Sequence, residues 1–202
     1  MFRSKTALRL LSQGAVAFAV TLFLAAALTL SSPVAAQVAP VPDASSDGYT
    51  PQLVELQARP TVALSGTAEW DEGMRALADA VNTLRTEMNK AGLEPAGNPL
   101  AVFVETDDKG FRFEAMIPLA ARPDTAPSLP NGMRIATSPT GKTMKFEHRG
   151  SYDEIDTTYE AITAYLDEKG LEAQNLFVEE YLSLPRTSDE DGAQVDIFVF
   201  LK

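Results

Sequence analysis

Apolar residues in this chain alternate between a strand-like and a helix-like period. Residues 53–67 have strand character interrupted at Pro60, which cannot donate a backbone hydrogen bond to a neighbouring strand. From Trp70 to Met88, apolar side chains recur three or four residues apart, which is typical of a surface helix. Gly92 suits the residue that ends such a helix, and Leu93 supplies the apolar contact that commonly follows. The pattern predicts a bent strand followed by a long helix.

Two further strands follow this helix. Residues 100–106 and 111–120 are strand-like and flank a polar loop whose Gly110 favours a hairpin turn. We therefore expect them to be antiparallel neighbours. Residues 122–130 contain three prolines and predict a linker.

The same order then occurs a second time. Residues 133–137 and 142–148 are strand-like, a helix that Gly170 ends follows, and residues 176–184 and 194–201 complete the set. The second helix carries its apolar face on Tyr152, Ile155, Tyr159, Ile162 and Leu166. Trp70-Asp71-Glu72 and Tyr152-Asp153-Glu154 open the two helices 82 residues apart, and Gly92-Leu93-Glu94 and Gly170-Leu171-Glu172 close them 78 residues apart.

The recurrence predicts two β-α-β-β repeats, the first spanning about residues 52–121 and the second about 131–202. The expected fold class is α+β: an antiparallel sheet with two long helices on one face and a cleft between the repeats. Ligand sites favour such junctions. The cleft is where a binding site is expected.

The amino-terminal segment predicts export. Arg3, Lys5 and Arg9 precede an uncharged apolar stretch, and small residues up to Ala36 suit a cleavage site, so residues 1–36 are expected to be a signal peptide. An uncleaved membrane anchor is the alternative. Residues 37–51 are predicted to be a flexible linker and residues 52–202 one domain, which would be periplasmic or secreted.

Charge and composition exclude several function classes. The chain has a formal charge of -11, and loss of a signal peptide with three basic and no acidic residues leaves about -14, which argues against nucleic-acid binding. With one histidine, His148, and no cysteine, neither a multi-histidine metal site nor a disulfide is expected. A phosphate-binding glycine loop and a serine nucleophile motif are both missing from the sequence. We expect no metal and no cofactor.

Three segments resemble a known bacterial family. They are His148-x-Gly150-x-Tyr152-Asp153, Glu179-x-Tyr181-Leu182-x-x-Pro185 and Phe111-x-Phe113-Glu114-Ala115-x-Ile117-Pro118-Leu119. Together they resemble the GyrI-like family, the effector-binding domains of multidrug-sensing activators of the AraC and MerR types. The resemblance spans about residues 53–202. It implies the doubled fold and the binding of bulky, aromatic or cationic compounds. The chain shows no DNA-binding region, which argues against a transcriptional role.

The resemblance also implies site residues. Glu179 would face the groove, with Tyr181 and Tyr152 stacking on a ligand and Trp70 and Phe103 as their counterparts in the first repeat. A carboxylate among aromatic rings attracts a cation by its charge and by the ring faces. From the residues alone other roles stay open: Glu179 could point to water instead of Glu180, and the aromatic residues could simply pack in the core.

Function is correspondingly open at this level. The leading hypothesis is a monomeric exported protein that binds or sequesters an amphipathic small molecule. A hydrolase of electrophilic toxins is the alternative, with Glu179 activating water and Tyr181 donating a proton. Haem binding of the SOUL type would rest on His148, for which a structural hydrogen bond is the simpler role. An envelope protein that meets a partner through its acidic face or the loop 122–130 is a fourth reading.

Overall fold

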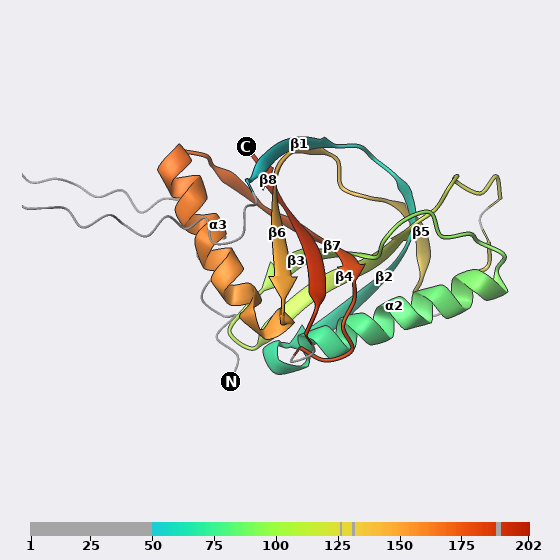
Figure 1. Ribbon diagram of the computed structural model, residues 1–202. Coiled ribbons are helices and arrows are strands. Elements are labelled where there is room, and N and C mark those ends of the chain that lie inside the picture. The colour runs from blue at the N-terminus through green and yellow to red at the C-terminus, as the bar shows by residue number, and fades with distance from the viewer. Residues whose placement is uncertain (1–49, 126, 131, 189–190) are drawn as a thin grey trace, which may run out of the picture.

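The chain folds into an α+β structure with one antiparallel sheet and two long helices (Figure 1). The computed structural model describes residues 50–125, 127–130, 132–188 and 191–202. The predicted signal peptide and most of the predicted linker, residues 1–49, lie outside the described residues. The elements in chain order are β1 (Gln52–Leu56), β2 (Pro60–Glu69), the 3-10 helix η1 (Trp70–Glu72), α2 (Gly73–Lys90), β3 (Leu100–Thr106), β4 (Gly110–Pro118), β5 (Arg134–Thr137), β6 (Gly141–Gly150), the 3-10 helix η2 (Tyr152–Glu154), α3 (Ile155–Lys169), β7 (Ala173–Ser183) and β8 (Ala193–Leu201).

The strands lie in the order β1-β6-β8-β7-β3-β4-β2-β5, and every pairing is antiparallel. The predicted hairpin of residues 100–106 and 111–120 is therefore confirmed as β3 and β4. The predicted interruption at Pro60 is also confirmed, because β1 ends at Leu56 and β2 begins at Pro60. Pro60 lies inside the sheet at its first strand residue, where β5 is its partner.

The two ends of the sheet are joined by one bent two-stranded ribbon. β1 runs into β2 and β5 runs into β6, and the register does not shift between Gln52↔Lys145 and Ala63↔Arg134. At the bend, Ser138 N donates to Arg59 O at 2.9 Å and Arg59 N donates to Ser138 Oγ at 3.0 Å. Figure 1 shows this ribbon arching away from the helices.

Both long helices pack on the same face of the sheet. Leu77, Val81 and Leu84 of α2 and Ile162 and Leu166 of α3 share one buried cluster with the inward residues of the strands. The opposite face carries a second, smaller cluster, against which Leu56 and Ala136 of the arching ribbon pack. Alternation along each strand explains this division, since successive side chains point to opposite faces.

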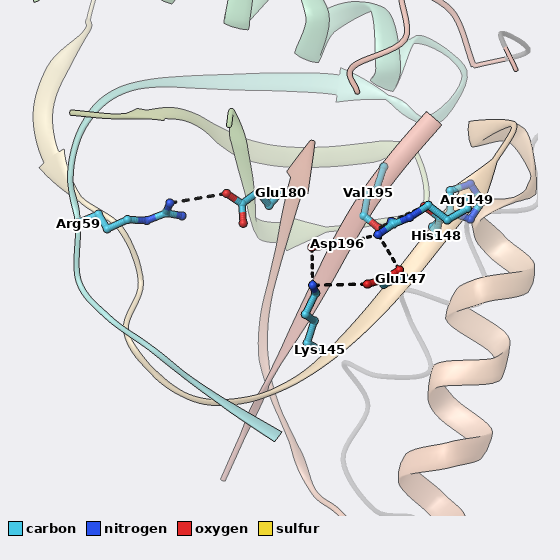
Figure 2. A network of polar contacts seen from close by, with 8 residues as sticks. All are labelled: Arg59, Lys145, Glu147, His148, Arg149, Glu180, Val195 and Asp196. Atoms are coloured by element: carbon cyan, nitrogen blue, oxygen red, sulfur yellow. Dashed lines mark hydrogen bonds and ion pairs between the residues drawn. The ribbon is translucent and has the colours of Figure 1, made fainter. Parts of the chain in front are cut away.

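Polar side chains outside these clusters form ion pairs on the face opposite the helices (Figure 2). Asp196 of β8 pairs with Lys145 at 2.6 Å and with Arg149 at 2.8 Å, both from β6. Arg149 Nη1 also donates to the backbone oxygens of His148 and Val195, each at 2.9 Å. These bonds hold the end of β6 against β8 just before the chain enters η2.

The helix starts and one glycine differ in detail from the expectation. Each helix opens with a 3-10 turn, so the α-helices begin at Gly73 and Ile155. The ends are as predicted: Gly92 and Gly170 have φ of 67° and 61°. Gly110 has no positive φ; a Cβ there would lie 2.0 Å from Ala68 O. Its small size is needed for the close approach of β2, not for the turn.

No helix among the described residues is long and apolar enough to cross a membrane.

Candidate ligand pocket

Glu179 is a carboxylate buried under α3, and three tyrosine hydroxyls donate to it. It lies on β7 with 1% of its surface exposed. Tyr159 donates to its Oε1 at 2.7 Å, and Tyr152 donates to its Oε2 at 2.8 Å. Tyr181 also donates to Oε2, and its hydroxyl lies 3.3 Å from that of Tyr152. Both carboxylate oxygens thus accept hydrogen bonds, and no cationic side chain among the described residues pairs with them.

Three different elements bring these groups together. Glu179 and Tyr181 share the helix-facing side of β7 because they are two residues apart on one strand. Tyr152 lies in η2, and Tyr159 follows two turns later on α3, so both side chains point from the helix layer towards the sheet. The loop before β3 holds β7 in place next to this cluster, since Tyr181 N donates to Pro99 O at 2.9 Å.

Burial governs the protonation of this cluster. Desolvation raises the pKa of Glu179, although the hydrogen bonds from Tyr181, Tyr159 and Tyr152 each act to lower it. Desolvation and the nearby Glu179 charge raise the pKa of all three tyrosines well above 10. The phenols are therefore protonated donors at neutral pH. The carboxylate loses its charge at a higher pH than an ordinary glutamate does.

A pocket lies between the two helices and above the middle of the sheet. Glu179 forms part of its wall together with Trp70, Gly73, Met74, Leu77, Ala101, Phe103, Phe111, Phe113, Tyr152, Ile155, Asp156 and Tyr159. Its volume is only about 40 Å³, which holds a few water molecules. A drug-sized ligand needs about 300–1,000 Å³. The pocket must therefore widen to accept such a molecule.

Aromatic rings form the end of the pocket distant from Glu179. Phe111 lies 5.2 Å from the ring of Trp70, 5.4 Å from Phe103 and 5.8 Å from Phe113, in tilted arrangements that favour attraction between the rings. Trp70 Nε1 donates to Asp107 O at 3.1 Å. This bond ties the start of the first helix to the hairpin between β3 and β4.

The sequence-predicted site residues separate into two groups. Glu179, Tyr152, Trp70 and Phe103 line the pocket. Tyr181, 1% exposed, lies behind Glu179 and is not part of the pocket wall.

The sequence does not single out Tyr159 or Phe111 as site residues. The apolar pattern places Tyr159 on the buried face of the second helix, and Phe111 occurs only in the family motif. The signal for Tyr159 was its position seven residues after Tyr152, which puts both tyrosines on one side of the helix. Nothing in the sequence distinguished Phe111 from a core phenylalanine.

His148 positions the entry to α3. Its Nε2 faces Ser151 O at 2.9 Å, and its Nδ1 lies 2.9 Å from Thr158 Oγ1. Because a carbonyl only accepts, Nε2 carries the proton of the neutral ring and Nδ1 accepts from Thr158. The ring also meets Tyr152 edge-on at 6.4 Å. With both nitrogens engaged, neither is open to a haem iron.

Replacing His148 with glutamine is expected to reduce the loss of stability in mild acid. Burial, the largest influence, lowers the pKa of His148 below 6.5. The native state then binds fewer protons than the unfolded state, so stability falls as pH drops below 6.5 towards the lowered pKa. Urea unfolding between pH 7 and about 5 checks this. Parallel pH profiles for the two proteins would contradict it.

No group of three or more histidine, aspartate or glutamate side chains in the described ranges is arranged to hold a metal ion.

Comparison with known proteins decides the family. The sequence-family model of the GyrI-like small-molecule-binding domain matches residues 49–202. The chain belongs to this family. Among curated protein sequences, none matches the chain significantly.

Solved structures share the fold of this GyrI-like domain. The EcmrR C-terminal domain aligns with a TM-score of 0.61 and 15% identity, over 76% of this chain and 98% of that domain. The longer EcmrR chain in the EcmrR–DNA complex aligns with the same TM-score and identity, and this chain spans 57% of its length. A hydrolase from Listeria innocua aligns with a TM-score of 0.56 and 16% identity, over 75% of this chain and 91% of that one. At these identities the similarity concerns the fold alone.

Proposed function

We propose that this GyrI-like domain binds an amphipathic aromatic or cationic small molecule in the pocket between α2 and α3, and that it sequesters this compound outside the cytoplasm. The main support is a buried carboxylate, Glu179, in the wall of a mostly apolar, aromatic pocket that the half-buried Asp156 also lines. Such a wall favours a cation with apolar substituents, since charge and ring faces attract it together. Export rests on the predicted signal peptide in residues 1–36.

The pocket fits the predicted cleft between two repeats. Its walls come from both halves of the chain, with Trp70 on one side and Tyr152 on the other. Ala101 of β3 pairs directly with Glu179 of β7. If 78 residues separate equivalent positions, these two are counterparts, and the local symmetry axis passes between them. An alanine on one side of the axis leaves room beside the carboxylate on the other.

A hydrolase is the second candidate, because a carboxylate with a raised pKa beside protonated phenols can act as a general base next to a proton donor. Glu179 would take a proton from a water molecule while the oxygen of that water bonds to an electrophilic carbon. The bond between this carbon and the leaving group would break, and the leaving group would receive a proton from a phenol. Tyr152 suits the donor role better than Tyr181, since Tyr152 lines the pocket.

A thermal-shift panel of lipophilic cations, neutral aromatic compounds and anions tests the proposed function. Cations are expected to raise Tm, because a ligand that binds only the folded state stabilises it. An Ala101→Leu variant, which fills the pocket beside Glu179, should lose these shifts. Mass spectrometry of the recovered compounds distinguishes the two candidates, since simple binding returns them unchanged. Equal shifts for cations and anions in both proteins would contradict the proposal.

A further inference from the structure

Phe111 stands between the small pocket and a much larger open groove. The groove has a volume of about 720 Å³ and runs beside the β3–β4 hairpin, along Thr67–Glu69, residues 105–107 and residues 109–112. Phe111 lines both the groove and the pocket. The ring is therefore a wall shared by two spaces, one too small for a drug-sized ligand and one open to solvent.

Phe111 is also the wall residue best able to move. Of the residues around the pocket, only Phe111, Tyr152 and Asp156 are half-buried, and the others are buried. Tyr152 is held by its hydrogen bond to Glu179, and Asp156 is charged and has an interaction of its own. Phe111 is the apolar member of the three and has no side-chain hydrogen bond to break.

The backbone around Phe111 is anchored, so the motion belongs to its side chain. Asp107 O accepts from Trp70 Nε1, and Asp107 Oδ1 accepts from the backbone N–H of Lys109 at 2.7 Å and of Gly110 at 2.9 Å. Gly73 leaves space for the ring, because a Cβ there would lie 2.8 Å from Phe111 Cζ. On this side the ring packs against a glycine, and on its other sides it contacts the rings of Trp70, Phe103 and Phe113.

The groove has a character of its own. It is lined by three carboxylates, of Glu69, Glu105 and Asp107, and by two cationic side chains, of Lys109 and Arg112. Glu105 and Arg112 pair at 2.7 Å. The carboxylates outnumber the cationic side chains, and the whole chain is strongly acidic. A positively charged tail suits this surface.

We propose that Phe111 is a movable wall and that the groove is a second subsite, so that the domain binds an elongated ligand with an aromatic head in the pocket and a cationic tail in the groove. This inference rests on the proposed binding of cations in the pocket. The ligand is thus elongated and enters from the groove past Phe111.

Ethidium and propidium are matched probes for this inference. Both carry a phenanthridinium ring system, and propidium has in addition a quaternary ammonium tail. Propidium is expected to bind about threefold more tightly than ethidium at low salt, the size of a solvent-exposed charge pair. Glu69→Gln should remove this advantage without changing ethidium affinity, and added salt should reduce it. Equal affinities of the two dyes would overturn the groove subsite.

Stopped-flow fluorescence with the same dyes tests the movable wall. Phe111→Ala should speed association about tenfold, because a required conformational change slows binding. Gly73→Ala should act in the same direction, since its methyl group competes with the seated ring; Gly73 has helical φ and ψ of -56° and -51°, which alanine adopts readily. Phe146→Leu is the control, and its association rate should match the wild type, because Phe146 is a buried aromatic residue that contacts Tyr165 outside the pocket.

Dye binding with unchanged association rates in both Phe111→Ala and Gly73→Ala would overturn the movable wall and leave the pocket intact. Absence of binding of either dye to the wild-type protein would overturn the proposed function and this inference together.

Discussion

Glu179→Gln is expected to weaken the binding of a lipophilic cation such as ethidium by about 30-fold at pH 7, while the protein stays folded. Removing one charge of a buried pair commonly costs about 2 kcal/mol or more of binding free energy, which corresponds to this factor. Glutamine keeps the size of the side chain and can still accept and donate hydrogen bonds among the three phenols. Fluorescence titration gives the change in Kd.

The same variant should not lower the free energy of unfolding at pH 7. Burial raises the pKa of Glu179, so the fold disfavours the ionised carboxylate in spite of its three hydrogen bonds. A neutral glutamine avoids that cost. A large loss of stability together with unchanged cation affinity would show that the carboxylate serves the fold and not the ligand.

Glu180→Gln is the matched control. Glu180 is the next residue on β7, and it points to the opposite face, where it lies 3.6 Å from Arg59 (Figure 2). Because alternation separates the two side chains, this variant should retain wild-type affinity. An equal loss in both variants would indicate a general effect of the acidic charge on cation binding.

Cation binding should also depend on pH with a definite sign. The raised pKa of Glu179 places the loss of its charge at a higher pH than for an ordinary glutamate, so affinity should fall on acidification while the pH is still above 4.5. Stability moves the other way for this group: the native state binds more protons, and its contribution is lost as pH rises through the folded pKa. Titrations of the wild type and Glu179→Gln from pH 8 downward test this, and a flat profile is expected for the variant.

Tyr159→Phe is expected to destabilise the protein by about 2 kcal/mol. The substitution removes a buried hydroxyl that donates to Glu179 Oε1 at 2.7 Å, and hydrogen bonds to charged groups contribute about 1.5–3 kcal/mol. The loss of one donor should also raise the pKa of Glu179 further and move the pH midpoint of cation binding upward. Urea unfolding and pH-dependent titration measure the two effects.

Tyr165→Phe provides the comparison on the same helix. Tyr165 is partly buried and meets Phe146 edge-on, and its hydroxyl takes no part in the Glu179 cluster. Both the free energy of unfolding and the pH midpoint should therefore match the wild type. If the two tyrosine variants behaved alike, the bond to Glu179 would have no special weight.

Much of the secondary structure could be predicted from the sequence because its signals are local. The apolar period of α2, the positive φ of Gly92 and the hairpin between β3 and β4 depend on residues close together in the chain. The exception is Gly110, which looked like a turn residue. It is required by the approach of β2, a contact between segments distant in sequence.

The site was predictable only where one strand or one helix determines it. Alternation placed Glu179 and Tyr181 on one face, as observed. How far each side chain lies from the pocket could not be deduced, because it depends on how α3 packs over β7. In the structure Tyr181 lies behind the carboxylate, whereas Tyr159 lines the pocket. The double role of Phe111 depends on two separate spaces in the folded chain.

The bent ribbon of β1–β2 and β5–β6 has a consequence for how the domain reaches its native state. Its paired residues lie between 71 and 93 positions apart in sequence, and such distant pairings slow folding because a long loop must close first. Residues 52–63 have no ribbon partner until residues 134–145 are available. β1 must wait for the second half of the chain, so the ribbon that joins the two ends of the sheet is expected to form late in folding.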